Sequence, residues 1–468
     1  MSQTTHKDEA KEEGALAPVK RVWYRSPFVA AVILGLCNFC APGLWGAMNS
    51  LGAGGQQTPW LINAGNALTF CLMILTAFLS STITDRVGVN FALFLGGIGF
   101  APYCAALYCN NVFGTRWFVL FGAATCGLSA GLFWGIEAAV AISYPERYNM
   151  GKFLGIWLSL CTAGSILGGA VNLGLNATDD KAGAVNPKVY LVFVSLASAG
   201  PFLAFLLPKP HQVQRSDGKA VRLYRNTPLL TELGLTLKLL FTRDYLLLVP
   251  LVVQAVFPES YTFTFIASHF TVRARALGSF LAAVTRIIAA NLLGRFLDSR
   301  TISLKNRARW AFIFLIVTRG AWWIWSTVLS VHFPTTEPID WNSKYFGRTF
   351  ALYIFLNITF QTHYLFLYFL IKNFVRKVDD ETRAAGLLRA VESASQAVAY
   401  GTSSIRSFAL LGSSSLNFGL WGISIIPAWL VVRRIGVDYF GAEDTDDSDE
   451  DRRLAGVVED HRVAELEK

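Results

Sequence analysis

Residues 26–84 read SPFVAAVILGLCNFCAPGLWGAMNSLGAGGQQTPWLINAGNALTFCLMILTAFLSSTIT and contain no Asp, Glu, Lys or Arg. About 20 consecutive apolar residues are enough for a helix to cross the hydrocarbon core of a bilayer. Because backbone groups in that core must bond to one another, a run of this length predicts two membrane-spanning helices joined by a short turn. The next run is similar, since Arg116 is the only charged residue between Arg86 and Glu137. The chain is therefore predicted to be a membrane protein.

Comparable apolar runs recur along the rest of the chain, of which 53% is hydrophobic and 16% charged. They predict an all-α membrane protein with about twelve transmembrane helices. The first span is expected to be the least regular, because Pro42 and Gly43 interrupt it. The expected spans are residues 27–48, 61–84, 90–110, 116–142, 153–175, 188–207, 244–268, 276–297, 310–331, 346–371, 384–411 and 416–433.

The distribution of Lys and Arg predicts the orientation of these spans. The chain has 41 Lys and Arg against 32 Asp and Glu, a net charge of +9. The basic residues gather in the loops that follow the even-numbered spans, and short basic loops stay in the cytoplasm. Both termini are therefore expected to be cytoplasmic. We interpret the positive charge as a consequence of topology and of attraction to membrane lipid, and we expect no nucleic-acid partner.

A basic stretch that contains Pro208, Pro210 and Pro228 divides the chain into two halves with six expected spans each. Repeated halves of this kind are common in membrane transporters. The expected organisation is a cytoplasmic tail (1–26), a six-helix bundle (27–207), a cytoplasmic linker (208–243), a second six-helix bundle (244–434) and an acidic cytoplasmic tail (435–468).

Two related loops support the repeat. Thr84-Asp85-Arg86-Val87-Gly88 follows the second span, and Gly294-Arg295-Phe296-Leu297-Asp298 follows the eighth. Together they resemble the Gly-x-Leu-Ala-Asp-Arg-x-Gly-Arg loop of the major facilitator superfamily, although Ser81 replaces its first Gly and Val89 its last Arg. The resemblance implies the major facilitator fold. An Asp in this loop can accept from helix N-terminal amides and pair with Arg. We therefore expect a latch on the cytoplasmic side formed by Asp85, Arg86, Gly88, Gly294, Arg295 and Asp298.

Within that superfamily, three stretches resemble the fungal branch of the uncoordinated-93 family. They are Gly46-Ala47-Met48-Asn49-Ser50-Leu51-Gly52-Ala53-Gly54-Gly55-Gln56, Phe133-Trp134-Gly135-Ile136-Glu137-Ala138-Ala139 and Tyr144-Pro145-Glu146-Arg147. The resemblance covers nearly the whole transmembrane region and implies a twelve-helix fold. Members of the family are divided between presumed transporters and regulators of other membrane proteins, so the resemblance leaves both functions open.

Ionisable residues inside spans are costly and indicate candidate functional sites. Glu137 in span four is a candidate proton carrier, with a structural salt bridge as the alternative. Arg286 in span eight is either a fixed countercharge or a site for an anionic substrate group. Other polar residues are candidates for contacts in a binding site near the bilayer midplane, with simple packing as the alternative; these residues are Asn38, Asn66, Glu259, Gln361 and His363.

Other patterns indicate structural roles. Arg389 and Glu392 are three residues apart, so they are expected to pair on one helical face. We expect Arg319 to pack within the fold or to pair with a carboxylate. The small residues of Gly164-Ser165-Ile166-Leu167-Gly168-Gly169 predict close helix packing. Asn176-Ala177-Thr178 is a possible N-glycosylation acceptor in an expected outer loop.

The sequence contains no phosphate-binding Gly-Lys-Ser pattern and no cluster of His and carboxylates with metal-ligand spacing. We therefore expect no enzyme, no cofactor and no metal site. The leading hypothesis is a secondary active transporter that moves an unidentified small molecule by alternating access and is coupled to protons. The alternative is a non-transporting regulator or trafficking partner of another membrane protein. We expect a protein that functions as a monomer in the plasma membrane or in an endomembrane such as the vacuole.

Overall fold

The computed structural model describes residues 22–440 apart from 57–58, 146–149, 216–220, 222–228, 300, 333–336 and 376–377. Most of the predicted N-terminal tail and most of the acidic tail lie outside the described residues. Within the described part, the chain is almost entirely helical, with only two isolated β-bridges.

The N-terminal half comprises α1 (Pro27–Asn38), η2 (Phe39–Gly43), α2 (Leu44–Ser50), η3 (Ala53–Gly55), α3 (Pro59–Val87), α4 (Val89–Ile98), α5 (Phe100–Phe113), α6 (Arg116–Ser143), α7 (Met150–Asn176), α8 (Pro187–Ala199) and η5 (Gly200–Leu206). Short segments η1 (Trp23–Arg25) and η6 (Pro210–Gln212) flank it. The C-terminal half comprises α10 (Arg243–Val256), α11 (Pro258–His269), α12 (Val272–Leu297), α13 (Leu304–His332), α14 (Phe346–Phe374), α15 (Val378–Ser403) and α16 (Leu411–Val432).

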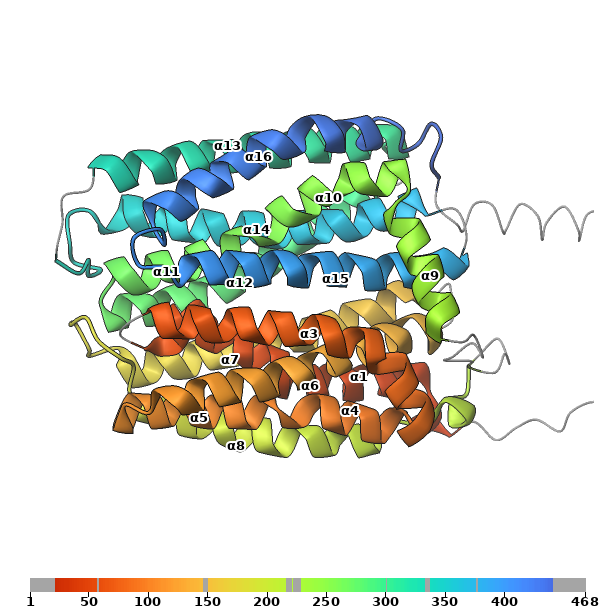
Figure 1. The fold of residues 1–468 in the computed structure, drawn as a ribbon, viewed down its shortest axis with the longest axis horizontal. Helices are drawn as coiled ribbons and strands as arrows, with labels where there is room; N and C mark the ends of the chain where they lie inside the picture. The colour runs from red at the N-terminus through yellow and green to blue at the C-terminus, as the bar shows by residue number, and fades with distance from the viewer. Residues whose placement is uncertain are drawn as a thin grey trace, which may run out of the picture.

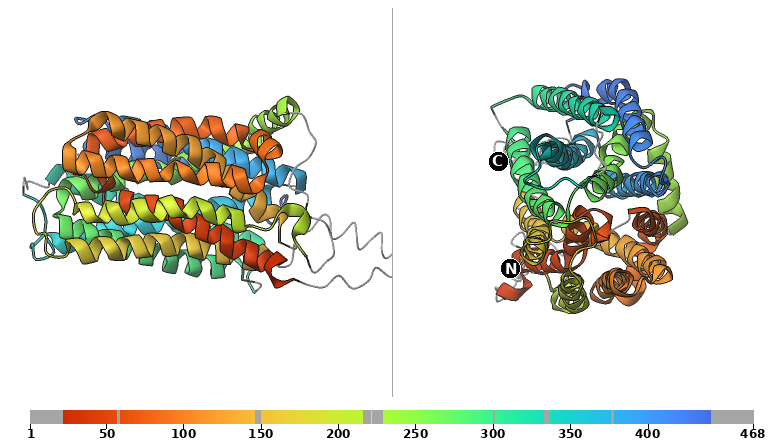
Figure 2. Two further views of the ribbon diagram at one scale, coloured as in Figure 1. Left: turned by 90° about the horizontal axis from the view of Figure 1, so that it is seen from below. Right: turned by 90° about the vertical axis from the view of Figure 1, so that its left-hand side faces the viewer.

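The long helices run side by side along the longest axis of the molecule (Figure 1). Seen along that axis, the two halves form two neighbouring bundles (Figure 2). At their boundary α3 packs against α15, and α7 packs against α12. Buried apolar side chains form one cluster in the N-terminal half and two in the C-terminal half. Phe263 and Tyr400 of the C-terminal half belong to the first cluster, so apolar packing continues across the boundary.

Eleven candidate membrane spans are present among the described residues, by length and apolar composition. The remaining expected span, 384–411, corresponds to α15, which carries Arg389 and Glu392 and falls outside that set. The expected boundary at residue 411 is wrong, because α15 ends at Ser403 and α16 already begins at Leu411. With α15 included, each half contains six helical spans among the described residues.

Two spans are broken at proline. The first consists of α1, the π-helical segment η2 and α2, with Pro42 inside η2, as the sequence predicts. The seventh is divided into α10 and α11, and Pro258 is the first residue of α11. Because proline has no N–H, it cannot bond to the carbonyl of the residue four positions earlier, and this leaves the carbonyl of Gln254 free for another donor.

Close packing joins α7 to the opposite half. A Cβ at Gly169 would lie 2.8 Å from Cα of Phe280 on α12, which no real side chain tolerates without a shift. The small residues of α7 thus allow the two helices to approach closely, as the sequence predicts.

The predicted linker contains a helix that was not expected from the sequence. Helix α9 (Leu229–Leu240) lies across the ends of the bundle helices at the right of Figure 1 and packs against α10 and α15. With 12 residues it is too short to cross a bilayer. Leu230 is 80% exposed. The linker is therefore partly an ordered helix at the end of the bundle.

Candidate functional site

A cavity of about 230 Å³ lies between the two halves. From the N-terminal half it is lined by η2, α2, α3, α5, α6 and α7, and from the C-terminal half by α10, α11, α12, α14 and α15. Aromatic rings of both halves form much of its wall, and these are Trp45, Phe70, Phe100, Trp134, Phe360 and Tyr364. Small-molecule sites usually combine an apolar wall with a few polar groups, so this cavity is the candidate binding site.

Arg389 and Glu392 form an ion pair on the cavity wall. Nη1 of Arg389 lies 3.2 Å from Oε2 of Glu392 on the same face of α15. The guanidinium also lies 4.3 Å from the ring centroid of Trp134 in the other half and 5.2 Å from that of Tyr364. A cation stacked on aromatic rings in a desolvated site is stabilised by the ring electrons. Glu392 therefore neutralises Arg389 within α15, and Arg389 contacts aromatic rings of both halves.

Glu259 lines the cavity next to Pro258 at the start of α11. Its Oε2 accepts hydrogen bonds from Nε2 of Gln396 (2.7 Å) and from the hydroxyl of Tyr400 (3.3 Å). Both donors are on α15. Gln396 was not among the expected site residues, because one amide on a helix with many polar residues gives no pattern that separates a ligand contact from ordinary packing.

Arg286 faces the same cavity from α12. One of its terminal nitrogens donates to Oδ1 of Asn357 at 2.5 Å, and its guanidinium lies 5.1 Å from the ring centroid of Phe360. No carboxylate of a described residue lies within 4.0 Å of the guanidinium nitrogens of Arg286. The predicted candidates Glu259, Arg286 and Gln361 therefore all reach the cavity wall, and the charge of Arg286 is not paired there.

Glu137 does not reach the cavity wall. It is fully buried on α6, where Nδ2 of Asn38 donates to Oε2 (2.8 Å) and Nε1 of Trp157 donates to Oε1 (3.3 Å). The nearest cavity-lining residues along these helices are Trp134, one turn earlier on α6, and Cys161, one turn after Trp157 on α7. Glu137 and Asn38 therefore form a buried polar group that joins α1, α6 and α7 behind the wall.

Asn66 and His363 also lie away from the cavity. Nδ2 of Asn66 donates to Oδ1 of Asn49 (2.9 Å), and the hydroxyl of Tyr103 donates to Oδ1 of Asn66 (3.1 Å). Nδ1 of His363 lies 2.8 Å from the carbonyl oxygen of Thr359, one turn earlier on α14. Both side chains are buried within their own half, where they satisfy local polar groups.

Arg319 is fully buried on α13 and contacts no carboxylate among the described residues. Its terminal nitrogens donate to three carbonyl oxygens, those of Gln254 (3.0 Å), Ala255 (3.1 Å) and Thr359 (3.3 Å). The carbonyl of Gln254 is the one that Pro258 leaves without a helical partner. The guanidinium thus binds the negative end of α10, which explains how a charge is accommodated inside the bundle.

Arg275 joins the two halves where α11 meets α12, and we call this the α11–α12 end. Only 1% of its surface is exposed. Its guanidinium donates to the carbonyls of Leu51 (2.7 Å), Gly52 (2.8 Å), Gln56 (3.0 Å) and Gly183 (2.8 Å), all in the N-terminal half. The expected spans 244–268 and 276–297 place Arg275 in the loop between them, and nothing in the sequence shows that distant carbonyls converge on it.

The remaining hydrogen bonds between described residues of the two halves lie near the same end. They join Asn63 to Thr264 and Ser403, Tyr353 to Ser50, Ser279 to Ser50 and Ala47, Val272 to Lys181, and Arg273 to Asp179. Position 52 at this end requires glycine, because its φ is +76° and because a Cβ there would lie 2.6 Å from the carbonyl oxygen of Phe263. The halves are therefore closed against each other at the α11–α12 end.

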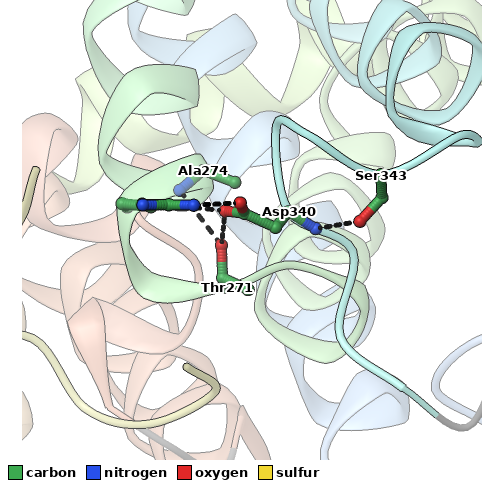
Figure 3. Close-up of polar contacts among 5 residues, drawn as sticks. Thr271, Ala274, Asp340 and Ser343 are labelled. Carbon is green, nitrogen blue, oxygen red and sulfur yellow. Dashed lines mark hydrogen bonds and ion pairs between the residues drawn. The ribbon is translucent and has the colours of Figure 1, made fainter. Parts of the chain in front are cut away.

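Asp340, in the loop between α13 and α14, fixes the start of α12 (Figure 3). Its Oδ1 accepts from Nε of Arg273 (2.7 Å) and from the hydroxyl of Thr271 (2.8 Å), and its N–H donates to the hydroxyl of Ser343 (2.9 Å). The hydrogen bond from Arg273 lowers the pKa of Asp340 to about 2. Asp340 therefore carries a negative charge at every pH near neutrality.

The repeated loop residues lie at the opposite end. Gly88, with φ +82°, forms the turn between α3 and α4, and the backbone N–H of Asp298 donates to the carbonyl of Gly294 at 2.9 Å. The side chains of Asp85, Arg86, Arg295 and Asp298 are exposed. Neither Asp85 nor Asp298 forms an ion pair with another described residue, so the expected latch is not formed in this conformation.

The structure argues against glycosylation of Asn176. This residue ends α7 and is 1% exposed. Its Nδ2 donates to the carbonyl of Asn172 (2.7 Å), and its Oδ1 accepts from the N–H of Asn186 (2.8 Å). A glycan on this amide would require both bonds to break, so we do not retain the predicted modification.

Comparison with known proteins identifies the family. Residues 63–343, which are more than half of the chain, match the sequence model of the family described as "Ion channel regulatory protein UNC-93". This chain belongs to the UNC-93 family. Its relatives include the "Notoamide biosynthesis cluster protein O'" of Aspergillus versicolor, which is 37% identical over 90% of this chain and 92% of its own length. An UNC93-like protein of Schizosaccharomyces pombe is 26% identical over 91% of this chain and 86% of its own length.

Solved structures show the same architecture for this UNC-93 family member. A D-xylose-proton symporter superposes with a TM-score of 0.60 at 12% identity, covering 87% of this chain and 97% of the symporter. An inward-facing bacterial homologue of the lysosomal transporter Spinster gives a TM-score of 0.59 at 12% identity, covering 90% and 99%. This likeness establishes the major facilitator fold. The structural neighbours are transporters rather than enzymes, although one relative is named for a biosynthesis cluster.

Proposed function

We propose that this UNC-93 family member is a secondary active transporter that moves a small molecule by alternating access. The observation that carries the proposal is a cavity between two bundles that are hydrogen-bonded to each other near one end only, among the described residues. A ligand in such a cavity contacts both halves. Rocking of the halves about this ligand would exchange the closed end for an open one.

The closure at the α11–α12 end is suited to reversal. Arg275 binds backbone carbonyls of η3 and its neighbours, and these carbonyls can return to water when the halves separate. Charge-assisted hydrogen bonds contribute about 1.5–3 kcal/mol each, and exchange with water offsets part of that on opening. Closure at the other end would then use the exposed loops of Asp85 and Asp298.

We further propose that Glu137 links transport to protons. Nδ2 of Asn38 donates to Glu137, and Oδ1 of Asn38 has no partner among the described residues. Rotation of this amide would present an acceptor to a protonated Glu137 and a donor to an ionised one. The pair can therefore satisfy both protonation states of the carboxyl group, which a proton carrier requires.

The positive-inside distribution of Lys and Arg supports cytoplasmic termini, so the α11–α12 end would face the cell exterior or an organelle lumen. The proposed location is the plasma membrane or an endomembrane such as the vacuole. In either membrane the described conformation would be closed to the outside.

The test is an untargeted comparison of solutes inside and outside cells that lack the protein, express it, or express Ala283→Phe at the same level. Ala283 is buried on the cavity wall, so the added ring would occupy the binding space. Gly422→Phe is the matched control, because Gly422 is exposed on α16 and a Cβ there would meet no atom within 4 Å. We expect a solute that redistributes with wild type and Gly422→Phe but not with Ala283→Phe. Identical profiles for wild type and Ala283→Phe would contradict transport.

The family description favours a second candidate, a regulator of another membrane protein. A regulator would co-purify stably with a channel, receptor or transporter, and filling the cavity would leave its effect unchanged. Capture of the Ala283→Phe variant with the same partner as wild type, together with no solute movement by either, would support this candidate over transport.

A further inference from the structure

Five Glu and Arg side chains line the cavity or lie just behind its wall, and two of them already neutralise each other. Arg389 and Glu392 form an ion pair, and Arg389 is stacked against Trp134. Glu259 and Arg286 are left. They carry opposite charges and line the same cavity, but no ion pair within 4.0 Å joins them. The fifth group, Glu137, is buried behind the wall.

Both of the unpaired groups retain bonding capacity. The two hydrogen bonds that Glu259 accepts from Gln396 and Tyr400 both end on Oε2, and Oε1 has no hydrogen-bond partner among the described residues. Arg286 uses one terminal nitrogen to bind Asn357, and its other donors, including the buried Nε, have no acceptor among the described residues. A carboxylate oxygen and guanidinium donors are therefore available to one ligand.

We propose that the cavity binds a small zwitterion with an aromatic or apolar side chain, with its carboxylate on Arg286 and its ammonium group on Glu259. This inference rests on the proposed function, because it names the substrate class of the same cavity. A purely anionic ligand would leave Glu259 without an opposite charge beside it, and a purely cationic ligand would leave Arg286 without one. A buried charge without an opposite charge is costly in a site of low dielectric. The cavity therefore favours a ligand that carries both a carboxylate and an ammonium group.

The shape of the cavity supports the same class. Glu259 and Arg286 lie on α11 and α12 in the C-terminal half, whereas Trp45, Phe70 and Trp134 extend the wall in the N-terminal half. A ligand with a charged end and a ring would therefore contact both halves. The volume of about 230 Å³ is below the roughly 300–1,000 Å³ of sites for drug-sized ligands, so the ligand is small.

Binding to the purified full-length protein tests the proposal with three probes that share a ring and a chain length. L-Phenylalanine carries both charges, phenethylamine carries only the ammonium group, and 3-phenylpropionate carries only the carboxylate. Isothermal titration and ligand-induced shifts in Tm are the readouts. Each missing charge-assisted contact should weaken binding by about tenfold or more. We therefore expect L-phenylalanine to bind at least about tenfold more tightly than either single-charge probe.

Two neutral variants assign the contacts. Arg286→Gln should abolish the advantage of L-phenylalanine over phenethylamine, and Glu259→Gln should abolish its advantage over 3-phenylpropionate. The Tm of each variant without ligand, and of the control Gly422→Phe, shows whether the fold is intact. Equal binding of all three probes, preference for a single-charge probe, or an unchanged preference in both folded variants would overturn the proposal.

Failure of this inference can be separated from failure of the proposed function. A solute that moves with wild type and not with Ala283→Phe, but that lacks an amine or a carboxylate, would overturn the zwitterion and leave transport standing. Preferential binding of L-phenylalanine with no flux of any solute in vesicles would support the zwitterion and contradict transport.

Discussion

Single polar residues inside the bundle act through specific partners. Four such residues lie within or beside spans, but their partners differ. Glu137 accepts from an amide and an indole, and Arg275 donates to carbonyls of the other half. Arg286 donates to an amide at the cavity, and Arg319 donates to carbonyls where a helix is broken. Burial alone therefore does not predict the role of a charge, and the partners do.

Glu137→Gln should remove coupling to the proton gradient and leave the fold intact. The amide has the same shape and still accepts a hydrogen bond from Asn38 or Trp157, but it cannot carry a proton. In reconstituted vesicles, we expect accumulation driven by a pH gradient to disappear while exchange of the transported solute at equal pH continues. The measurement is flux with and without the gradient. Unchanged gradient-driven accumulation would remove Glu137 from the coupling mechanism.

Arg319→Met should destabilise the protein by about 1–3 kcal/mol, because the buried carbonyl of Gln254, which Pro258 leaves without a helical partner, would lose its donor. Arg319→Lys should lose less, because an ammonium group still supplies charge and donors to the end of α10. Thermal unfolding in detergent measures both. Arg406→Met, at an exposed site, is the control. Equal Tm values for Arg319→Met and the control would contradict a stabilising role for Arg319.

Individual helices and loops show which features can be predicted from sequence. The apolar runs predict the spans well, and Pro42 correctly predicts the irregular first span, because both depend on local chemistry. The small residues of α7 likewise predict close packing. The end of α15 and the helix α9 were not predicted. In α15, polar residues fit a helix only because neighbouring helices surround them, and α9 is a short amphipathic segment within a polar linker.

The site was only partly predictable for a related reason. Glu259, Arg286 and Gln361 lie on the cavity wall as expected from their depth in the spans, whereas Glu137, Asn38, Asn66 and His363 lie off it. The rotation of each helix about its axis decides between these outcomes. Charged residues inside spans are visible in a sequence, but helix rotation depends on tertiary packing.

The loop between α13 and α14 should make stability depend on pH at the acid end. The pKa of Asp340 is lowered in the folded protein, to about 2, from an ordinary value of 3.8. Its stabilising contribution is therefore fully present above about pH 4 and is lost as the pH falls towards 2. We expect Asp340→Asn to have a lower Tm than wild type at neutral pH. The Tm values of wild type and variant should converge as the pH falls over that acid range. A constant difference in Tm between the two proteins would show that the charge of Asp340 does not stabilise the fold.

At the scale of the whole molecule, the hydrogen bonds that join described residues of the two halves lie near one end. Arg275 makes four of the hydrogen bonds that close it, and the helices that line the cavity pass between the closed end and the loops of Asp85 and Asp298. We therefore expect the cavity to communicate with one side of the membrane at a time, and weakening of the closed end to shift the balance between the two sides.

The most direct test is the rate at which a membrane-impermeant maleimide labels Cys161 from each side of sealed vesicles. Cys161 lines the cavity, and a variant in which the other six cysteines are replaced by alanine reports on it alone. We predict that Arg275→Met increases labelling from the outer side by about tenfold or more and decreases labelling from the cytoplasmic side. Arg116→Met, an exposed charge at the start of α6, should change neither rate. Labelling rates from both sides that are unaffected by Arg275→Met, or that rise together, would contradict alternating access.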